Sequence, residues 1–267
     1  LQQDYYKLFM ADNEKCANEI VWAINCDGLT GQAYGNTTFF IHAASGDDHD
    51  DYGVTGGWNG YRATKAFGDK FPKDVSGNID YNADLRGKAF YTSKFSGTPA
   101  QGLITTLDDV SNFATGFHIK KYINIRSDGA KVHDPDKTYS DIDFPVFRLP
   151  EMYLIYAEAV LRGGSGGTLA NALTYVNLIR TRAGASQYSS SDLTLQNILD
   201  ERARELFWEG HRRTDLIRYN LLTTSSYLWP WKGGIASGTS VDSKYNLFPV
   251  PAANITANPN LEQNTGY

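Results

Sequence analysis

Residues 195–222 read LQNILDERARELFWEGHRRTDLIRYNLL, and this stretch decides the fold. Apolar side chains recur in its first half at the spacing of one helical face, at Leu195, Ile198, Leu199, Ala203, Leu206 and Phe207. This stripe predicts an amphipathic helix. The opposite face carries charged residues, namely Glu201, Arg202, Arg204, Glu205 and Glu209. Gly210 is expected to break or bend the helix, because glycine costs about 1 kcal/mol relative to alanine inside one.

Charged residues also crowd the turns after Gly210, at His211, Arg212, Arg213, Asp215 and Arg218. They predict a packed ion-pair network, because buried charges must be paired. Glu201 and Glu205 lie one helical turn apart, but arginines alternate with them, which favours ion pairs over the two facing carboxylates of a glycosidase. The sequence contains no nucleophile elbow, P-loop or Rossmann fingerprint. We therefore predict that the protein is not an enzyme.

Two further helices precede this stretch. Apolar residues at helical spacing predict the first, at Leu149, Met152, Tyr153, Tyr156, Ala157 and Val160, with Pro150 in the first turn. Thr168 is expected to cap the second helix, and Gly184 to end it. Its inward residues are Leu169, Ala172, Leu173, Val176 and Ile179. The short connection between the two helices predicts an antiparallel hairpin, with the 195–207 helix packed beside it.

The remaining elements are predicted as shorter pieces. The end of a helix is expected at residues 4–9, a buried strand within 19–25, and a short helix at 63–71. Strands or extended segments are expected at 85–95 and 116–125, a solvated aspartate-rich loop at 127–143, and a non-helical, surface-wrapping tail at 227–267.

The composition excludes two classes of protein and leaves the state of the cysteines open. With 267 residues, 41% of them hydrophobic, the chain can bury a substantial core. A net charge of −5 argues against nucleic-acid binding, and no apolar run reaches the ~20 residues that a membrane-spanning helix needs. Cys16 and Cys26 form either a disulfide or two free thiols. The chain begins at Leu1 without a signal peptide or a lipid-attachment cysteine, so we expect a processed or truncated protein.

The glycine-rich stretch 27–60 is the expected functional region. Aromatic residues are dispersed through it and just beyond it, at Tyr34, Phe39, Phe40, Tyr52, Trp58 and Tyr61. This composition predicts an ordered loop rather than disorder, and long ordered loops are usually functional. The acidic cluster at 46–51 (GDDHDD) is interpreted as solvated rather than as a Ca²⁺ site, since EF-hand spacing is absent. No histidine pair has metal-ligand spacing, and Trp229 and Trp231 are interpreted as anchors of the tail rather than as a sugar platform.

Five motifs, in order along the chain, resemble the SusD/RagB family of glycan-binding outer-membrane lipoproteins. They are NEIVWAI (18–24), DFPVFRLPEMYLIYAEAVL (143–161), VNLIRTRAG (176–184), ERARELFWEGHRRTDLIRY (201–219) and PVPAANITANPNLEQNTGY (249–267). The resemblance implies a mainly α fold, a helical-repeat, TPR-like scaffold with a few short strands and a loop-rich ligand-binding region. Because family members are about twice as long, the chain resembles their carboxy-terminal half, with the amino-terminal half absent. We expect a binding region at 1–143, a helical scaffold at 144–222 and a tail at 223–267.

Within the family the sequence is most similar to the founding starch-binding member, whose site is an arc of aromatic rings. The segments QAYGNTTFF (32–40) and GGWNGYR (56–62) resemble the region that supplies two of these rings, which maps them onto Tyr34 and Trp58. Sugar rings have apolar C–H faces that stack on aromatic planes, and neighbouring glycines leave the Trp58 indole uncovered. Polar candidates for binding sugar hydroxyls are Asn36, Asn59 and Arg62.

The resemblance implies non-catalytic binding of starch or maltooligosaccharides, which are α-glucans, at the outer-membrane surface. It implies delivery to a SusC-like, TonB-dependent transporter, and a membrane attachment only through a lipid anchor outside this chain. No cofactor is expected, and a Ca²⁺ ion with unassigned ligands stays open. Two alternatives remain, namely a receptor for another polysaccharide or host glycan, and a mainly structural transporter lid.

Overall fold

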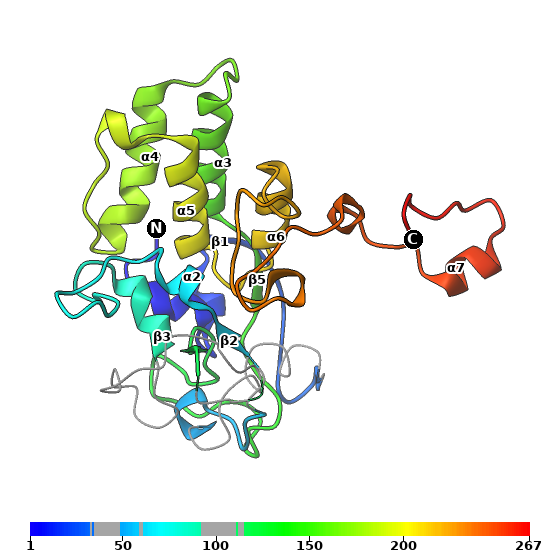
Figure 1. The fold of residues 1–267 in the computed structure, drawn as a ribbon. Helices are drawn as coiled ribbons and strands as arrows, with labels where there is room; N and C mark the ends of the chain where they lie inside the picture. The colour runs from blue at the N-terminus through cyan, green and yellow to red at the C-terminus, as the bar shows by residue number, and fades with distance from the viewer. Residues whose placement is uncertain (33, 35–48, 59–60, 92–110, 112–114) are drawn as a thin grey trace. The chain divides into compact units, whose positions relative to one another are not determined.

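The computed structural model describes residues 1–32, 34, 49–58, 61–91, 111 and 115–267. The chain divides into two compact units, Leu1–Gly210 and His211–Tyr267. Within the first unit, helices α3 (Leu149–Leu161), α4 (Leu169–Arg182) and α5 (Leu195–Glu205) lie side by side at one end. Strands β2 (Arg62–Ala63) and β3 (Phe90–Tyr91) lie toward the other end (Figure 1). The structure is mostly helical with a few short strands, which confirms the predicted fold class.

The three long helices form where the apolar periodicity predicts them. α3 spans Leu149–Leu161, α4 spans Leu169–Arg182, and α5 spans Leu195–Glu205. The Thr168 side chain accepts a hydrogen bond from the Asn171 N–H, which confirms the predicted cap of α4, and Thr194 caps α5 in the same way. α3 packs against both α4 and α5. Their shared core consists of Leu154, Ala157, Ala172, Val176, Ile179, Leu193 and Ile198.

The predicted break near Gly210 is confirmed, but the helix ends earlier than the pattern suggests. α5 stops at Glu205, and the backbone then turns at Trp208 (φ 59°) and Gly210 (φ 87°) before α6 begins at Arg212 and runs to Arg218. A left-handed conformation is unfavourable for a bulky residue such as tryptophan. Packing of the Trp208 indole against two aromatic core clusters accompanies this turn.

The strands form two small antiparallel sheets. β1 (Ile20–Ile24) pairs with β5 (Phe144–Arg148), and a second sheet has the order β2 (Arg62–Ala63), β4 (Phe117–Ile119), β3 (Phe90–Tyr91). β1 was expected to be buried, and this was wrong, because Val21 is 66% and Trp22 is 55% exposed. In the part of the chain that the structure describes, β1 has a single neighbouring strand, so most of its apolar side chains stay accessible.

Several shorter elements differ from their predictions in type or length. The predicted strand at 85–95 begins as a 3₁₀ helix, η4 (Leu85–Ala89), and its residues 92–95 lie outside the described residues. Only Phe117–Ile119 of the predicted extended segment 116–125 forms a strand. The helix predicted at 63–71 shortens to α2 (Lys65–Gly68). At the start of the chain, two 3₁₀ turns, η1 (Tyr5–Phe9) and η2 (Asn13–Cys16), replace the predicted helix end.

The second unit was predicted to be extended after residue 227, but it contains short helices. These are η6 (Lys232–Gly234), η7 (Ser243–Asn246) and α7 (Ala252–Ala257). The buried Lys232 ammonium group donates to the carbonyl oxygens of Leu221, Thr224 and Tyr227 at 3.3, 2.6 and 2.7 Å. A side chain that closes the loop in this way fixes a segment without regular structure. Among the described helices of the whole chain, none is long and apolar enough to cross a membrane.

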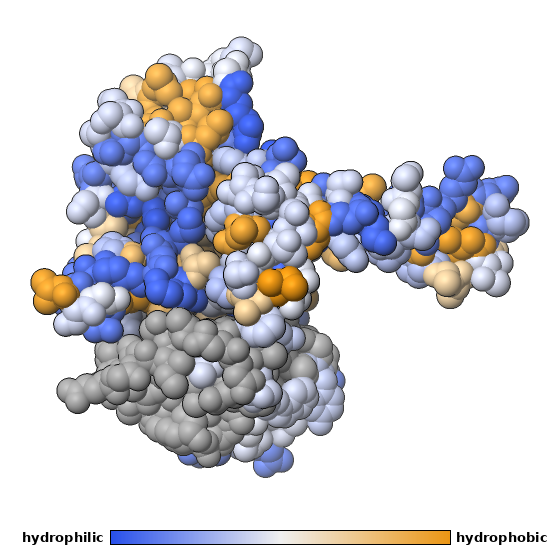
Figure 2. Space-filling view, viewed as in Figure 1, coloured by the Kyte–Doolittle hydropathy of each residue, from blue (hydrophilic) through white to orange (hydrophobic). Residues whose placement is uncertain are grey.

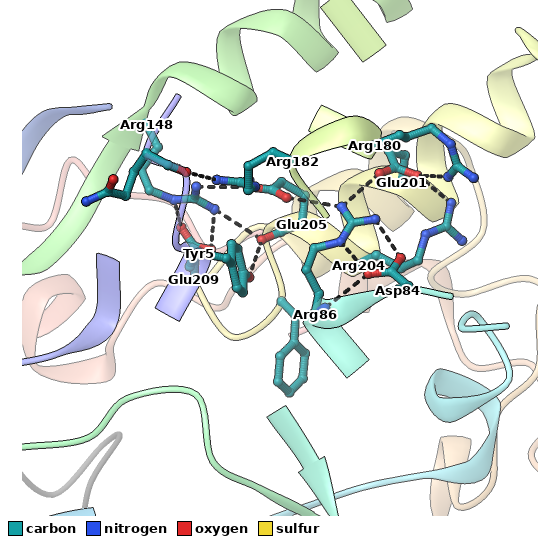
Figure 3. Close-up of polar contacts among 12 residues, drawn as sticks. Tyr5, Asp84, Arg86, Arg148, Arg180, Arg182, Glu201, Arg204, Glu205 and Glu209 are labelled. Carbon is teal, nitrogen blue, oxygen red and sulfur yellow. Dashed lines mark hydrogen bonds and ion pairs between the residues drawn. The ribbon is translucent and has the colours of Figure 1, made fainter. Parts of the chain in front are cut away.

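The first unit contains a buried ion-pair network (Figure 3). Its acidic members are Glu19, Asp84, Glu201, Glu205 and Glu209, and its basic members are Arg86, Lys121, Arg148, Arg180, Arg182 and Arg204. Each of these residues is at most 9% exposed. The network confirms that Glu201 and Glu205 serve ion pairs, as their alternation with arginines predicted.

Arginine forks make the network continuous. Arg148, at the end of β5, lies 2.7 Å from Glu19, 3.0 Å from Glu205 and 2.7 Å from Glu209. Arg86, on η4, lies 2.7 Å from Asp84 and 2.8 Å from Glu201, and it also contacts Glu205. A planar guanidinium with five donors suits this bridging role better than an ammonium group. The network therefore joins β5, η4, the end of α4 and the α5 region.

Glu205→Gln is expected to lower the free energy of unfolding by about 3–5 kcal/mol, the cost of removing one partner from a buried ion pair. The variant removes one carboxylate partner from each of Arg86, Arg148 and Arg182, in positions that are removed from water. Urea denaturation of the purified chain measures this change. Asp69→Asn, which removes the solvent-accessible pairs with Lys65 and Lys73, is the control and should change stability by about 0.5 kcal/mol or less. Equal effects of the two substitutions would contradict the central role of the network.

The network also makes stability depend on pH in the acid range. Burial alone would raise the pKa of Glu201, but the guanidinium groups of Arg86, Arg204 and Arg180 outweigh it and lower the pKa below the usual 4.5. The pKa of Glu205 is lowered by Arg182, Arg148 and Arg86 despite its burial. Below about pH 4.5 the unfolded chain binds protons that the folded chain does not, so folding weakens as the pH falls.

Urea midpoints measured between about pH 7 and pH 3 should therefore fall steeply below about pH 4.5. Glu201→Gln removes one of the carboxylates responsible, so its midpoint should start lower at neutral pH and fall less steeply. Parallel curves for the two proteins would show that Glu201 does not contribute to the acid sensitivity.

Candidate functional site

The loop region of the first unit rests on an aromatic core. This core contains Tyr5, Leu8, Phe9, Ala11, Cys16, Tyr52, Val54, Tyr122 and Ile142. Tyr52 and Val54 precede Trp58, whereas Tyr122 and Ile142 flank the polar stretch 127–139. Each of these loops therefore starts or ends at a side chain that is fully removed from water, which anchors its base.

Asn124 joins three loops by hydrogen bonds. Its backbone N–H donates to the Tyr52 carbonyl oxygen at 2.7 Å. Its side-chain amide nitrogen donates to the carbonyl oxygens of Gly53 at 3.3 Å and Tyr139 at 3.4 Å, and its amide oxygen accepts from the Asp141 N–H at 3.1 Å. The residue is 2% exposed, so these bonds form in a site with little water, where unpaired polar groups would be costly. Asn124 therefore holds the bases of these loops at a common point.

The stretch 127–143 was predicted to be a solvated loop, and this was wrong for three of its aspartates. Asp134, Asp141 and Asp143 are buried. Asp134 accepts hydrogen bonds from the N–H groups of Asp136, Thr138 and Tyr139 at 2.8–3.0 Å, and burial raises the pKa of Asp143. These carboxylates accept hydrogen bonds from backbone N–H groups that are not paired in a helix or sheet. An aspartate-rich composition therefore does not show by itself whether the carboxylates are solvated or support the loop from inside.

Both predicted binding residues are exposed. Tyr34 is 55% and Trp58 is 58% exposed, and they stand on separate loops. The Tyr34 ring lies 5.1 Å from the half-buried Tyr139 ring at an angle of 57°. A hydrogen bond between the two hydroxyl groups, with desolvation adding to it, raises the pKa of Tyr139. The structure therefore pairs Tyr34 with a residue that the sequence analysis did not single out. The available signal was that Tyr139 is the only aromatic residue between 127 and 143.

The polar residues expected beside the two rings are only partly described. Asn36 and Asn59 lie outside the described residues. Arg62 is described, and its guanidinium donates to the carbonyl and hydroxyl oxygens of Thr115 at 3.2 and 3.3 Å. Arg62 therefore holds Thr115, two residues before the start of β4.

A pocket of about 420 Å³ opens between the loops that carry Tyr34 and Tyr139. It is lined mainly by polar side chains, including Asp27, Thr30, Arg126, His133 and Asp141. Asp27, His133 and Asp141 are close enough together to hold a cation, because one ligand atom from each lies within 4.8 Å of the other two. Asp27 already accepts hydrogen bonds from Leu29 and Thr30, and Asp141 accepts from the N–H groups of Gly28 and His133, so support of the loop backbone accounts for the cluster without an ion.

Other candidates from the sequence have structural surroundings. Residues 46–48 of the acidic cluster lie outside the described part, and Asp51 lies 3.3 Å from Lys120. Cys16 and Cys26 form no disulfide, which leaves the free-thiol alternative. In the second unit, the Trp229 ring packs 5.9 Å from Tyr227 and 4.7 Å from the Lys232 ammonium, and both Trp229 and Trp231 are half-buried. This packing agrees with an anchoring role for Trp229.

The described residues define a helical-scaffold protein that presents aromatic side chains on loops fixed by internal hydrogen bonds. The profile of the SusD family matches residues 18–267. The starch-binding protein SusD of Bacteroides thetaiotaomicron is 35% identical over 296 aligned positions, which include 99% of this chain and 52% of that protein. The chain belongs to the SusD family.

Further comparisons agree with this assignment. The SusD-like protein P25 of Formosa agariphila is 28% identical, with 99% of this chain and 52% of that protein covered. The chain therefore spans about half the length of the curated relatives it matches. Surface glycan-binding protein A from Bacteroides fluxus has the same fold, with a TM-score of 0.68 and 23% identity over 100% of this chain and 54% of that one. The corresponding protein from Bacteroides thetaiotaomicron, in complex with laminarihexaose, gives a TM-score of 0.61 and 23% identity over 99% and 55%.

Gly53→Ala tests whether the loop junction requires a residue without a side chain. Gly53 has φ +70°, and a Cβ atom there would approach the Asn124 carbonyl oxygen to 2.3 Å. Gly129 has a similar φ of +75° with open space around it, so Gly129→Ala is the matched control. Backbone strain should cost both variants about 1 kcal/mol, and the clash should cost Gly53→Ala a further ~1–3 kcal/mol. Thermal unfolding measures the difference, and equal melting temperatures would contradict the close approach.

Proposed function

We propose that this chain binds an α-glucan, starch or maltooligosaccharide, without chemical conversion, by stacking consecutive glucose units on Tyr34 and Trp58. The observation that carries the proposal is the exposure of both rings, Trp58 on a loop whose base is fixed by the aromatic core and Asn124, and Tyr34 in contact with Tyr139. A ring held in place before the ligand arrives loses little conformational entropy on binding. The identity to a starch-binding relative supports the choice of ligand.

Glycan binding without catalysis agrees with the positions of the acidic residues. Glu201 and Glu205 are fully buried and paired with arginines, so they are not available to a sugar. A glycosidase needs an acid and a base, or a nucleophile, on the two sides of a bound glycosidic linkage. The aromatic side chains, by contrast, are accessible and chemically inert, as a binding platform requires.

The proposal includes a surface location and partners beyond the sugar. We place the protein at the outer membrane, attached through a lipid anchor outside this chain, and delivering glycan to a SusC-like, TonB-dependent transporter. The amino-terminal half that relatives possess is a further partner. The amino-terminal half could cover the exposed apolar residues of the helical hairpin, which are Met152, Ile155, Leu169 and Leu178. Apolar surface gathers at that end of the first unit (Figure 2).

A receptor for a different glycan is the second candidate, and one observation favours it. A solved structure with the same fold contains laminarihexaose, which is not the ligand of the starch-binding relative. The scaffold therefore accommodates more than one glycan, and the loops determine which one binds.

Calorimetric titration of maltoheptaose, laminarihexaose and other oligosaccharides should give binding heat with maltoheptaose. Trp58→Ala and Tyr34→Ala should each weaken that binding at least about tenfold, or about 1.4 kcal/mol, because each removes a stacking surface. Trp22→Ala is the matched control, since Trp22 is equally exposed but lies on β1. Binding of other glycans but not of maltoheptaose would reject the starch assignment. Undiminished binding by both loop variants would reject the aromatic platform.

A further inference from the structure

Tyr34 does not stand alone on its loop, because the Tyr139 ring meets it at 5.1 Å. An exposed tyrosine ring without a neighbour samples several rotamers, and a ligand that needs one of them pays for the ordering. The inclined contact restricts the plane of the Tyr34 ring, and the side-chain hydrogen bond that raises the pKa of Tyr139 adds to this restriction. The half-buried Tyr139 ring offers less surface to a ligand than Tyr34 does.

The backbone of Tyr139 is fixed independently of Tyr34. Its N–H donates to the buried Asp134 carboxylate at 2.9 Å, and its carbonyl oxygen accepts from the Asn124 amide. The start of the loop that leads to Tyr34 also lies against this segment, since a Cβ atom on Gly28 would come within 2.9 Å of the Tyr139 carbonyl oxygen. Tyr139 is therefore the rigid member of the aromatic pair.

The same Asn124 amide connects this pair to the loop that carries Trp58. Asn124 donates to the carbonyl oxygen of Gly53, five residues before Trp58, as well as to that of Tyr139. Two aromatic planes can select a glycan by its curvature only if their relative orientation is fixed. The Asn124 amide therefore bridges the loop that carries Tyr139 and the loop that carries Trp58.

We propose that Tyr139 is a positioning residue of the glycan site, which sets the plane of Tyr34, and that Asn124 fixes this pair relative to the Trp58 loop. The proposal rests on the proposed function and deepens it by naming the residues that order the platform. Tyr139 acts through Tyr34 rather than as a third stacking surface. Its removal should therefore matter only while the Tyr34 ring is present.

A double-mutant cycle tests this dependence. Tyr34→Ala, Tyr139→Ala and the double variant are titrated with maltoheptaose, or with the glycan of the panel that binds the wild-type chain most tightly. Tyr139→Ala should weaken binding at least fivefold in the wild-type background and less than twofold in the Tyr34→Ala background. Tyr139→Phe retains the ring contact and loses the hydroxyl bond, so it should lie between wild type and Tyr139→Ala.

Tyr175→Ala is the control for general destabilisation. Tyr175 is also half-buried and stacks on another tyrosine, Tyr153, at 4.8 Å, but it lies on the helical hairpin. It should lower the melting temperature without changing the affinity. If Tyr139→Ala does not fold, Tyr139→Phe carries the cycle, with a smaller loss of affinity that should again vanish in the Tyr34→Ala background.

The outcomes separate this inference from the proposed function. If Tyr34→Ala and Trp58→Ala weaken binding while Tyr139 variants do not, or if the effects of Tyr34→Ala and Tyr139→Ala multiply, the positioning role is rejected and the platform stands. If the wild-type chain binds no glycan of the panel, both are rejected.

Discussion

The first unit depends on a set of buried charges that satisfy one another. Glu205 lies between Arg86, Arg148 and Arg182, so cations from η4, β5 and α4 meet at one carboxylate on α5. Removing ions from water is costly, and their mutual attraction offsets that cost only with good geometry and further hydrogen bonds. These ion pairs form only when the helices and strands that carry the charged side chains are correctly placed relative to one another. The network therefore specifies how these elements pack, beyond what the apolar faces of the helices determine.

Residues 121–124 connect the ion-pair network to the candidate site. Lys121 belongs to the network through Glu209, at 2.6 Å, and burial lowers the pKa of Lys121 to about 8 although Glu209 opposes the shift. The next residue, Tyr122, is fully buried in the aromatic core, and Asn124 follows as the junction of the loops. Within residues 121–124, Lys121 thus belongs to the ion-pair network, Tyr122 packs in the aromatic core, and Asn124 supports the loops. Loops with little regular structure can hold a site when their bases are fixed in this way.

The sequence predicts the parts of this molecule whose stability is local. The periodicity of α3, α4 and α5, the Thr168 cap and the break after α5 are all readable, because each depends on residues within a turn or two. The short strands are not, since β3 and β4 owe their pairing to partners distant in sequence rather than to their own pattern. Tyr34 and Trp58 could be selected as exposed aromatic candidates. Tyr139 was missed because its contact with Tyr34 bridges more than a hundred residues, and because Asp134 looks like surface charge until its backbone partners are seen.

The distribution of charge also bears on the kind of glycan that such a platform accepts. The arginines of α4 and α5 point inward and are committed to carboxylates, so they cannot serve as clamps for an anionic sugar. The pocket between the Tyr34 and Tyr139 loops contains Asp27, Asp141 and Asp143 against a single arginine, Arg126, which itself pairs with Asp128 at 2.8 Å. The net charge of −5 of the chain and the acidic lining of this pocket oppose the approach of sulfated or uronic acid chains by charge repulsion. The proposed recognition of a neutral glucan by aromatic stacking does not require a free cation in this pocket.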